Sequence, residues 1–364
     1  MDAHEEHLKR ELEDLENVQD DEEPDESGAD LYTISSFGVD YTVEFLVKKL
    51  QTGQFYIPDF QRRYVWSMAQ ASRFIESLLL GLPVPGIFLF KETDSPKHLV
   101  IDGQQRLKSV QFFYQKEFNG KLFKLSGLKS KWNGLTYEEL EDNDRLRLDD
   151  GVIHTTVFRQ DAPQEGMASV YEVFERINTG GVKLSAQEIR SCVLYGEFNN
   201  LLFELNRDEN WRLIYGPESV RLKDVELILR FFTFLSRYQD YKRPVNNFLS
   251  DYMESNRNPS DAFLKEKSDL FRRTVSLVSD GVGRRAFRPE RALNTAVYDS
   301  FMVAVGSCIE AEHPVSAESV GKAYDTLMAN SAYREATGSS TAGEESVKAR
   351  FPIAQRAVED HAPR

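Results

Sequence analysis

The sequence predicts an α+β protein in which a mixed α/β domain precedes an all-α domain. Two observations lead to this fold class. Before residue 196, short β-branched or apolar segments alternate with segments whose apolar residues recur at helical spacing. After Gly196, strand-like segments almost disappear and helical periodicity continues. With 41% hydrophobic and 12% aromatic residues, the chain has enough apolar side chains for the cores of two domains.

Acidic residues are concentrated near the N-terminus. The whole chain has a formal net charge of −14, which by itself argues against a nucleic-acid partner. Residues 1–30, however, hold 14 acidic and 2 basic residues and therefore carry −12 of this charge. We expect residues 1–35 to be an acidic disordered tail and the nearly neutral remainder to be compatible with DNA. The tail could simply aid solubility, or it could cover a basic site as a mimic of a polyanion.

The elements of the first domain, residues 36–196, follow from local signals. Ser67 with Gln70, and Ser185 with Glu188, form capping boxes that begin two helices. Two apolar strands flank a Thr-Asp-Ser-Pro turn and predict a hairpin. A stretch rich in Gly, Lys and Asp is interpreted as a surface insertion. The predicted order is a helix over 42–52, a strand over 55–57, a helix over 67–80, strands over 86–90 and 98–101, a helix over 104–118, the insertion over 119–150, a strand over 152–158, and helices over 167–178 and 185–195.

Residues 197–364 are predicted to form the all-α domain. The periodic segments are 197–208, 222–238, 257–278, 290–311 and 316–330, followed by a flexible loop and a short final helix. The two cysteines, Cys192 and Cys308, are too few and too far apart for a disulfide scaffold or a zinc ribbon. No signal peptide and no long apolar run is present, so we expect a cytoplasmic protein with no membrane partner.

The segment Asp102-Gly103-Gln104-Gln105-Arg106 carries the strongest functional signal. It follows an apolar strand and opens a helix, so free backbone N–H groups at the helix start would face an anion. Gly103 allows a ligand to approach the backbone, and Gln104 and Gln105 can hold a water or a base edge. Asp102 could orient a water or bind a metal ion, and Arg106 could neutralise a phosphate. The structural alternative is a turn at Asp102 with Arg106 in a salt bridge.

A second segment, residues 57–66, combines arginines with aromatic side chains. Arg62 and Arg63 offer forked donors for phosphate, and Gln61 offers both donors and an acceptor. Tyr64 and Trp66 provide ring faces on which a base could stack. The alternative is that the aromatic side chains belong to the core and that the arginines are solvated.

Two further segments are candidates for ligand contact. In residues 174–185, Asn178 and Gly180 lie in a tight link between two helices, where glycine supplies a positive φ. This link could be only a helical corner, or Arg176, Asn178 and Lys183 could point at the same ligand. Residues 281–291 form an arginine-rich loop in which Arg284, Arg285 and Arg288 could contact DNA phosphates. A solvated loop is the alternative there.

Three strings resemble the hallmark motifs of the GmrSD restriction endonuclease N-terminal domain family. They are F-Q-R-R-Y-V-W at residues 60–66, D-G-Q-Q-R at residues 102–106 and F-E-R-I-N-T-G-G at residues 174–181. The resemblance implies a ParB/sulfiredoxin-like core, in which a nucleotide phosphate lies against a strand-to-helix turn. It also implies a module of bacterial anti-phage defence that binds and hydrolyses a nucleoside triphosphate, with or without Mg²⁺, and senses DNA, including modified phage DNA.

Carried over motif by motif, the resemblance implies roles for individual residues. Asp102, Gln105 and Arg106 would be catalytic. Arg63 and Trp66 would face DNA. The residues expected to bind the nucleotide are Gln61, Arg62, Tyr64, Gly103, Gln104, Asn178 and Gly180.

This sequence departs from the full-length restriction members of the family, which append an H-N-H nuclease domain. Its six histidines show no metal-ligand spacing, so no metal site built by protein side chains alone is predicted, and it contains no P-loop. We expect an NTP-hydrolysing, DNA-sensing subunit whose nuclease or toxin partner is a separate polypeptide, and which could form homo-oligomers. The alternatives are a non-enzymatic, antitoxin-like regulator and a stand-alone nuclease with an unrecognised site.

Overall fold

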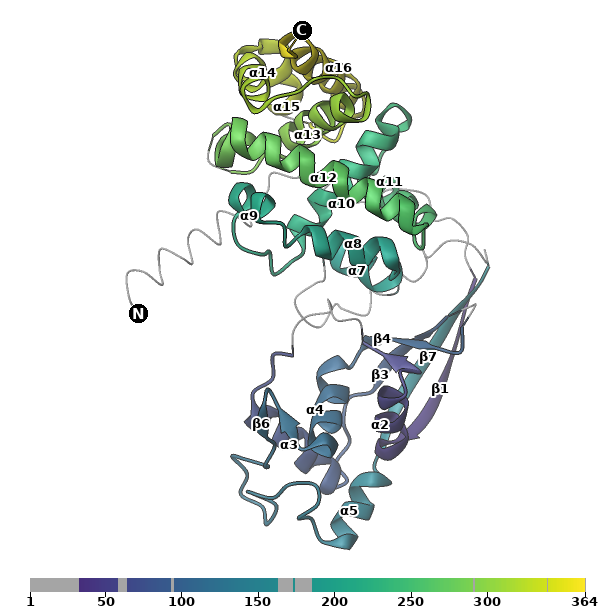
Figure 1. The fold of residues 1–364 in the computed structure, drawn as a ribbon. Coiled ribbons are helices and arrows are strands. Elements are labelled where there is room, and N and C mark those ends of the chain that lie inside the picture. Colours follow the sequence, from purple (N-terminus) through teal and green to yellow (C-terminus); the bar gives the residue numbers. More distant parts are fainter. Residues whose placement is uncertain are drawn as a thin grey trace. The chain divides into compact units, whose positions relative to one another are not determined.

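The computed structural model of this chain describes residues 33–57, 64–92, 95–162, 173, 185–290, 292–338 and 340–363. The chain divides into two compact units, and the division falls between Leu184 and Ser185. The first unit combines a five-stranded sheet with helices, and the second is built from helices (Figure 1). The predicted α+β fold class is therefore confirmed.

The sequence predicts a domain boundary near residue 196, where strand-like segments give way to helical ones, but the two units divide earlier, before Ser185. Helix α7 (Ala186–Val193) groups with the helical unit. Its Arg190 side chain is fully buried and pairs with Glu226 of α10 (Lys223–Arg237). The Ser185 hydroxyl, which caps α7, also donates to the Arg221 carbonyl at 2.8 Å. These contacts attach α7 to the helices that follow it.

The sheet of the first unit mixes parallel and antiparallel pairs. Its strands are β1 (Thr33–Thr42), β2 (Phe55–Tyr56), β3 (Ile87–Lys91), β4 (His98–Asp102) and β7 (Val152–Ala162), in the spatial order β1-β7-β3-β4-β2. β1 pairs antiparallel with β7, and β3 pairs antiparallel with β4, as the predicted hairpin requires. The β7–β3 and β4–β2 pairs are parallel.

The N-terminal boundary of the folded part differs from the prediction. Thr33, Ile34 and Ser35 belong to β1, and Thr33 lies opposite Ala162 of β7. These three residues therefore form part of the sheet and not part of a tail. Residues 1–32 of the predicted tail lie outside the described residues.

One face of the sheet packs against three helices, α2 (Val43–Gln51), α3 (Met68–Leu79) and α4 (Gln104–Gln115) (Figure 1). Alternate strand residues, Ile87, Leu89, Val100, Ile153 and Val157, enter the same buried cluster as the apolar side chains of the helices. The predicted capping box of Ser67 and Gln70 begins α3. This core holds the end of β4 and the start of α4 in place, and the candidate site lies there.

The interpretation of residues 119–150 as a surface insertion is wrong. Its apolar side chains Phe123, Leu125, Trp132, Leu140 and Leu148 are buried in the core of the first unit. Asp149, at the end of α5 (Asp142–Asp149), accepts hydrogen bonds from the hydroxyls of Tyr114 and Tyr137. A small hairpin of β5 (Glu117–Phe118) and β6 (Lys121–Leu122) also ends the preceding helix earlier than predicted.

The second unit contains more helices than the sequence predicts. Besides α7 and α10, the described helices of this unit are α8 (Glu197–Leu205), α9 (Glu209–Tyr215), α11 (Val245–Ser255), α12 (Asp261–Gly281), α13 (Thr295–Glu310), α14 (Ala317–Ala329), α15 (Ser331–Gly338) and α16 (Glu344–His361). Two short 3₁₀ turns, η2 (Tyr238–Asp240) and η3 (Gly283–Phe287), are also present. Helices α9, α11 and α15 were not predicted, and α16 is long, not short. Helix α13 is buried along almost its whole length and packs against α10, α12 and α16.

A buried charge cluster lies in the core of the helical unit. Asp299 of α13 is fully buried and accepts two hydrogen bonds from Arg230, at 2.9 Å from Nε and 2.6 Å from Nη2. Arg350 of α16 places its Nη2 3.5 Å from the same carboxylate and also donates to the Thr341 carbonyl. Burial lowers the pKa of the Arg350 guanidinium. The Asp299 carboxylate is thus the shared counter-ion of two buried arginines.

Within the described part of the chain, none of the helices combines the length and the apolar character needed to span a membrane.

Candidate anion-binding site

The connection between β4 and α4 requires glycine. Gly103 has a φ of +102°, which side chains of L-residues rarely allow. A Cβ at this position would lie 2.3 Å from Cγ2 of Ile87, whose side chain is 1% exposed. Gly103 therefore lets the chain turn from strand to helix in close contact with β3. The sequence suggested that Gly103 lets a ligand approach the backbone; the group in close contact with it in the structure is the Ile87 side chain of β3.

The N-terminus of α4 has no capping side chain among the described residues. Helices α2 and α3, by contrast, are capped by the hydroxyls of Thr42 and Ser67. The first turn of α4, residues 104–106, also contains no acidic side chain. Backbone N–H groups at a helix start carry partial positive charge, so this terminus can accept an external anion.

Arg106 lies in the first turn of α4, and its side chain extends back to Asp102 at the end of β4. Its Nη2 is 2.5 Å from Oδ2 of Asp102, and its side chain is 16% exposed against 42% for Asp102. The buried Nε of Arg106 has no hydrogen-bond partner in the described part of the chain. The salt bridge that the sequence left as an alternative is therefore present, and it places beside the α4 N-terminus a cation whose buried Nε has no partner among the described residues.

Gln105 contacts the backbone of the second motif. Its Oε1 accepts hydrogen bonds from the backbone N–H groups of Val65, at 3.0 Å, and Trp66, at 3.2 Å. The Tyr64 hydroxyl lies 2.7 Å from Oγ of Ser109, which in turn donates to the Gln105 carbonyl at 2.7 Å. Ser109 was not among the residues predicted from the sequence, although its place four residues after Gln105 on a helix was a usable signal.

The aromatic residues of the second motif pack into the first unit. Tyr64 meets Phe112 edge-on at 5.0 Å between ring centres, and Trp66 meets Phe74 at 5.8 Å. Both rings border the core, and burial raises the pKa of Tyr64. Val65 between them is 70% exposed. These contacts account for Tyr64 and Trp66 by packing, without a stacked base.

Comparison with known families matches residues 43–195 to the GmrSD restriction endonuclease, N-terminal domain. This match supports the family suspected from the three motifs. The match includes all three motifs by which the sequence resembles it. The chain is also 34% identical over 89 residues to an uncharacterized protein of Methanocaldococcus jannaschii. That similarity covers 18% of this chain and 15% of the archaeal protein, so the chain spans a small part of that relative's length.

Within the matched region, the described structure places some of the predicted site residues close together. Gly103, Gln104, Gln105 and Arg106 follow Asp102 directly at the start of α4, and Tyr64 and Trp66 adjoin the same helix. The remaining predicted ligand residues of this region lie outside the described residues; they are Gln61, Arg62, Arg63, Arg176, Asn178, Gly180 and Lys183.

The arginine-rich segment, residues 281–291, has a different local structure from the predicted loop. Residues 283–287 form the 3₁₀ turn η3, not an open loop. Arg288 donates to the carbonyls of Ile214 and Tyr215, at 2.9 and 2.8 Å, and so caps the end of α9. Burial and the nearby Arg284 lower the pKa of Arg288.

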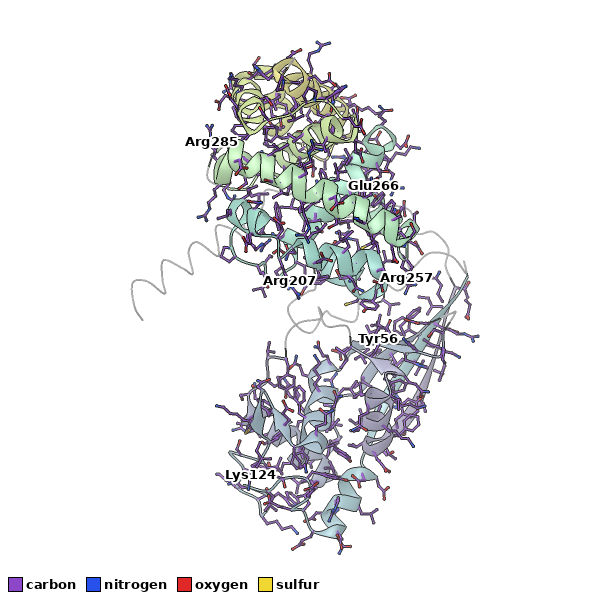
Figure 2. The ribbon with its side chains drawn as sticks, in the orientation of Figure 1. Tyr56, Lys124, Arg207, Arg257, Glu266 and Arg285 are labelled. Carbon is purple, nitrogen blue, oxygen red and sulfur yellow. The ribbon has the colours of Figure 1, made fainter. Side chains whose placement is uncertain are left out.

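The other two predicted DNA contacts in this segment are more accessible. Arg285 projects from the surface (Figure 2), with its guanidinium 3.1 Å from Asp325 and above the ring of Tyr324. Arg284 is exposed. Of the three predicted DNA contacts, Arg284 and Arg285 thus remain available to a phosphate, whereas Arg288 is used within the fold.

Proposed function

We propose that this chain is a nucleotide-binding component of a restriction or anti-phage system and that a nucleoside triphosphate binds at the N-terminus of α4. The single observation that carries the proposal is the uncapped start of α4 beside Arg106, whose buried Nε has no partner among the described residues. The match of residues 43–195 to the GmrSD restriction endonuclease N-terminal domain supports the biological setting.

The arrangement suits a triphosphate chemically. Phosphate oxygens would accept from the N–H groups of the first turn of α4 and from Arg106. Asp102 supplies a carboxylate beside the N-terminus of α4. Within the described ranges, no cluster of three or more His, Cys, Asp and Glu side chains could hold a metal ion by itself. A magnesium ion is commonly held by one or two carboxylates together with the phosphates of the substrate, so Asp102 fits that role. For hydrolysis, Asp102 would orient the attacking water.

Replacing Arg106 by alanine should weaken triphosphate binding. A hydrogen bond to a charged group contributes about 1.5–3 kcal/mol, so we expect the dissociation constant to rise by roughly 10- to 100-fold. Titration calorimetry of the full chain with ATP and with GTP, in Mg²⁺, measures this change. Arg73→Ala, at an exposed position of α3, is the matched control and should bind like the wild type. Unchanged binding by Arg106→Ala would place the nucleotide elsewhere.

Replacing Asp102 by alanine should abolish turnover while leaving the anion-binding groups of α4 present. Release of inorganic phosphate from ATP and GTP measures it, with calorimetry of the same variant as the check on binding. A variant as active as the wild type would refute a role for Asp102 in hydrolysis. Binding without turnover by the wild type itself would favour the regulatory alternative.

We further propose that Arg284 and Arg285 contact DNA phosphates. Each phosphate contact adds about 0.9 to the slope of log affinity against log salt concentration. The double variant Arg284→Ala with Arg285→Ala should therefore reduce this slope for a DNA duplex by about 1–2. Lys348→Ala with Arg356→Ala removes the same charge from exposed positions of α16 and serves as the control. An equal reduction in both double variants would indicate a general charge effect.

A further inference from the structure

We propose that Gln105 is a positioning residue, which acts on ligand binding through the Tyr64–Trp66 segment that it holds against α4. The resemblance of the D-G-Q-Q-R string implied a catalytic role for this side chain. Its contacts point instead to the backbone of another motif. The consequence for ligand binding rests on the proposed function, whereas the positioning itself does not.

The orientation of the Gln105 carboxamide is settled by its partners. The backbone N–H groups of Val65 and Trp66 can only donate, so the atom that they share must be the side-chain oxygen. A carboxamide oxygen has two lone pairs, and these two bonds use both. The oxygen of Gln105 is therefore fully engaged by the segment and has no acceptor capacity left for a ligand or a water.

A second connection joins the same two pieces of chain. Ser109 uses its hydroxyl hydrogen in the bond to the Gln105 carbonyl, so the Tyr64 hydroxyl must donate to Ser109. The side chain of Ser109 is completely buried, which keeps it away from any ligand in solvent. The segment is thus fixed at Tyr64 through Ser109 and at Val65 and Trp66 through Gln105.

This fixation matters because the segment adjoins the candidate site. Gln105 is the second residue of α4, so the bonds to Val65 and Trp66 are made at the helix terminus where the phosphate is proposed to bind. Val65 is 70% exposed and supplies little packing of its own. Removing the Gln105 bonds would therefore loosen the segment locally and leave the core of the unit in place.

Hydrogen exchange of the full chain tests the positioning without any ligand. In Gln105→Met, which keeps the length of the side chain but cannot accept, the amides of Val65 and Trp66 should exchange about ten-fold faster or more. Gln105→Glu retains an oxygen acceptor and should restore slow exchange. Gln115→Met, an exposed glutamine at the end of the same helix, is the control and should match the wild type. Wild-type exchange in Gln105→Met would overturn the proposal.

The effect on the ligand is measured by titration with ATP and Mg²⁺. Gln105→Met and Ser109→Ala should both weaken ATP binding relative to Gln115→Met, because both release the same segment. Weaker binding in Gln105→Met with exchange unchanged would mean direct contact and would overturn the proposal. If the wild type binds no ATP, the proposed function fails, and the exchange result still decides the positioning.

Discussion

Replacing Asp299 by asparagine is expected to cost the protein about 3–5 kcal/mol of its free energy of unfolding, because the change leaves buried cations without their counter-ion. Asp299 is fully buried and is the carboxylate shared by Arg230 and Arg350. An asparagine of the same shape keeps the volume but removes the charge. Urea unfolding of the full chain, followed by circular dichroism, measures the difference.

Two further variants keep this prediction testable if the asparagine variant does not fold. Arg350→Met removes the more weakly bonded cation and leaves the paired hydrogen bonds between Arg230 and Asp299, so it should cost clearly less. Glu318→Gln breaks an exposed pair with Lys322 and should leave the unfolding midpoint unchanged within error. A similar loss in Arg350→Met and Asp299→Asn would show that shape, and not charge balance, controls this part of the core.

The second large effect is expected at Gly103. Alanine there would adopt a φ of +102°, at a cost of about 1–2 kcal/mol, and its Cβ would overlap Ile87, adding about 1–3 kcal/mol. Ile87 belongs to the core and cannot move aside. We therefore expect Gly103→Ala to lose about 2–5 kcal/mol in urea unfolding and to bind ATP more weakly, because the start of α4 must shift.

Gly53 provides the matched control for this prediction. It also has a positive φ, +69°, but a Cβ added to its backbone would meet none of the described atoms within 4 Å. Gly53→Ala should therefore show the conformational cost alone, about 1–2 kcal/mol. Ile87→Ala makes room for the added methyl group, so its combination with Gly103→Ala should cost less than the sum of the single changes. Equal losses at Gly53 and Gly103 would contradict the close contact with β3.

Local signals in the sequence predicted much of the local structure. The capping boxes at Ser67 and Ser185 begin helices as predicted, and strands β3 and β4 form the predicted hairpin. No strand was predicted over β1, because it contains Gly38 and Asp40, whose residue types are depleted in strands, and because its partner β7 is far along the chain. The stability of a strand depends on such pairing more than on its own composition. Helix α16 contains Pro352, yet it runs to His361 because it packs against α13 and α14.

At the candidate site, the strand-to-helix turn was predicted, but the contacts made around it were not. The sequence indicated that Asp102–Arg106 would join a strand to a helix, and the structure has this turn. It could not indicate that Gln105 would meet Val65 and Trp66, because such contacts depend on how separate elements pack. The sequence also could not show whether Tyr64 and Trp66 stack on a base or pack at the border of the core, because both roles require the same aromatic residues.

The order of the strands in the chain has a consequence for synthesis. β7 lies between β1 and β3 in the sheet, yet it is the last of the five strands to leave the ribosome. The β3–β4 hairpin and helices α3 and α4 can associate earlier, so completion of the sheet is a late folding step. A nascent chain that stalls before residue 152 would expose two unpaired strand edges, and such edges are sites of aggregation. The five-stranded sheet can therefore be completed only after β7 has been synthesised.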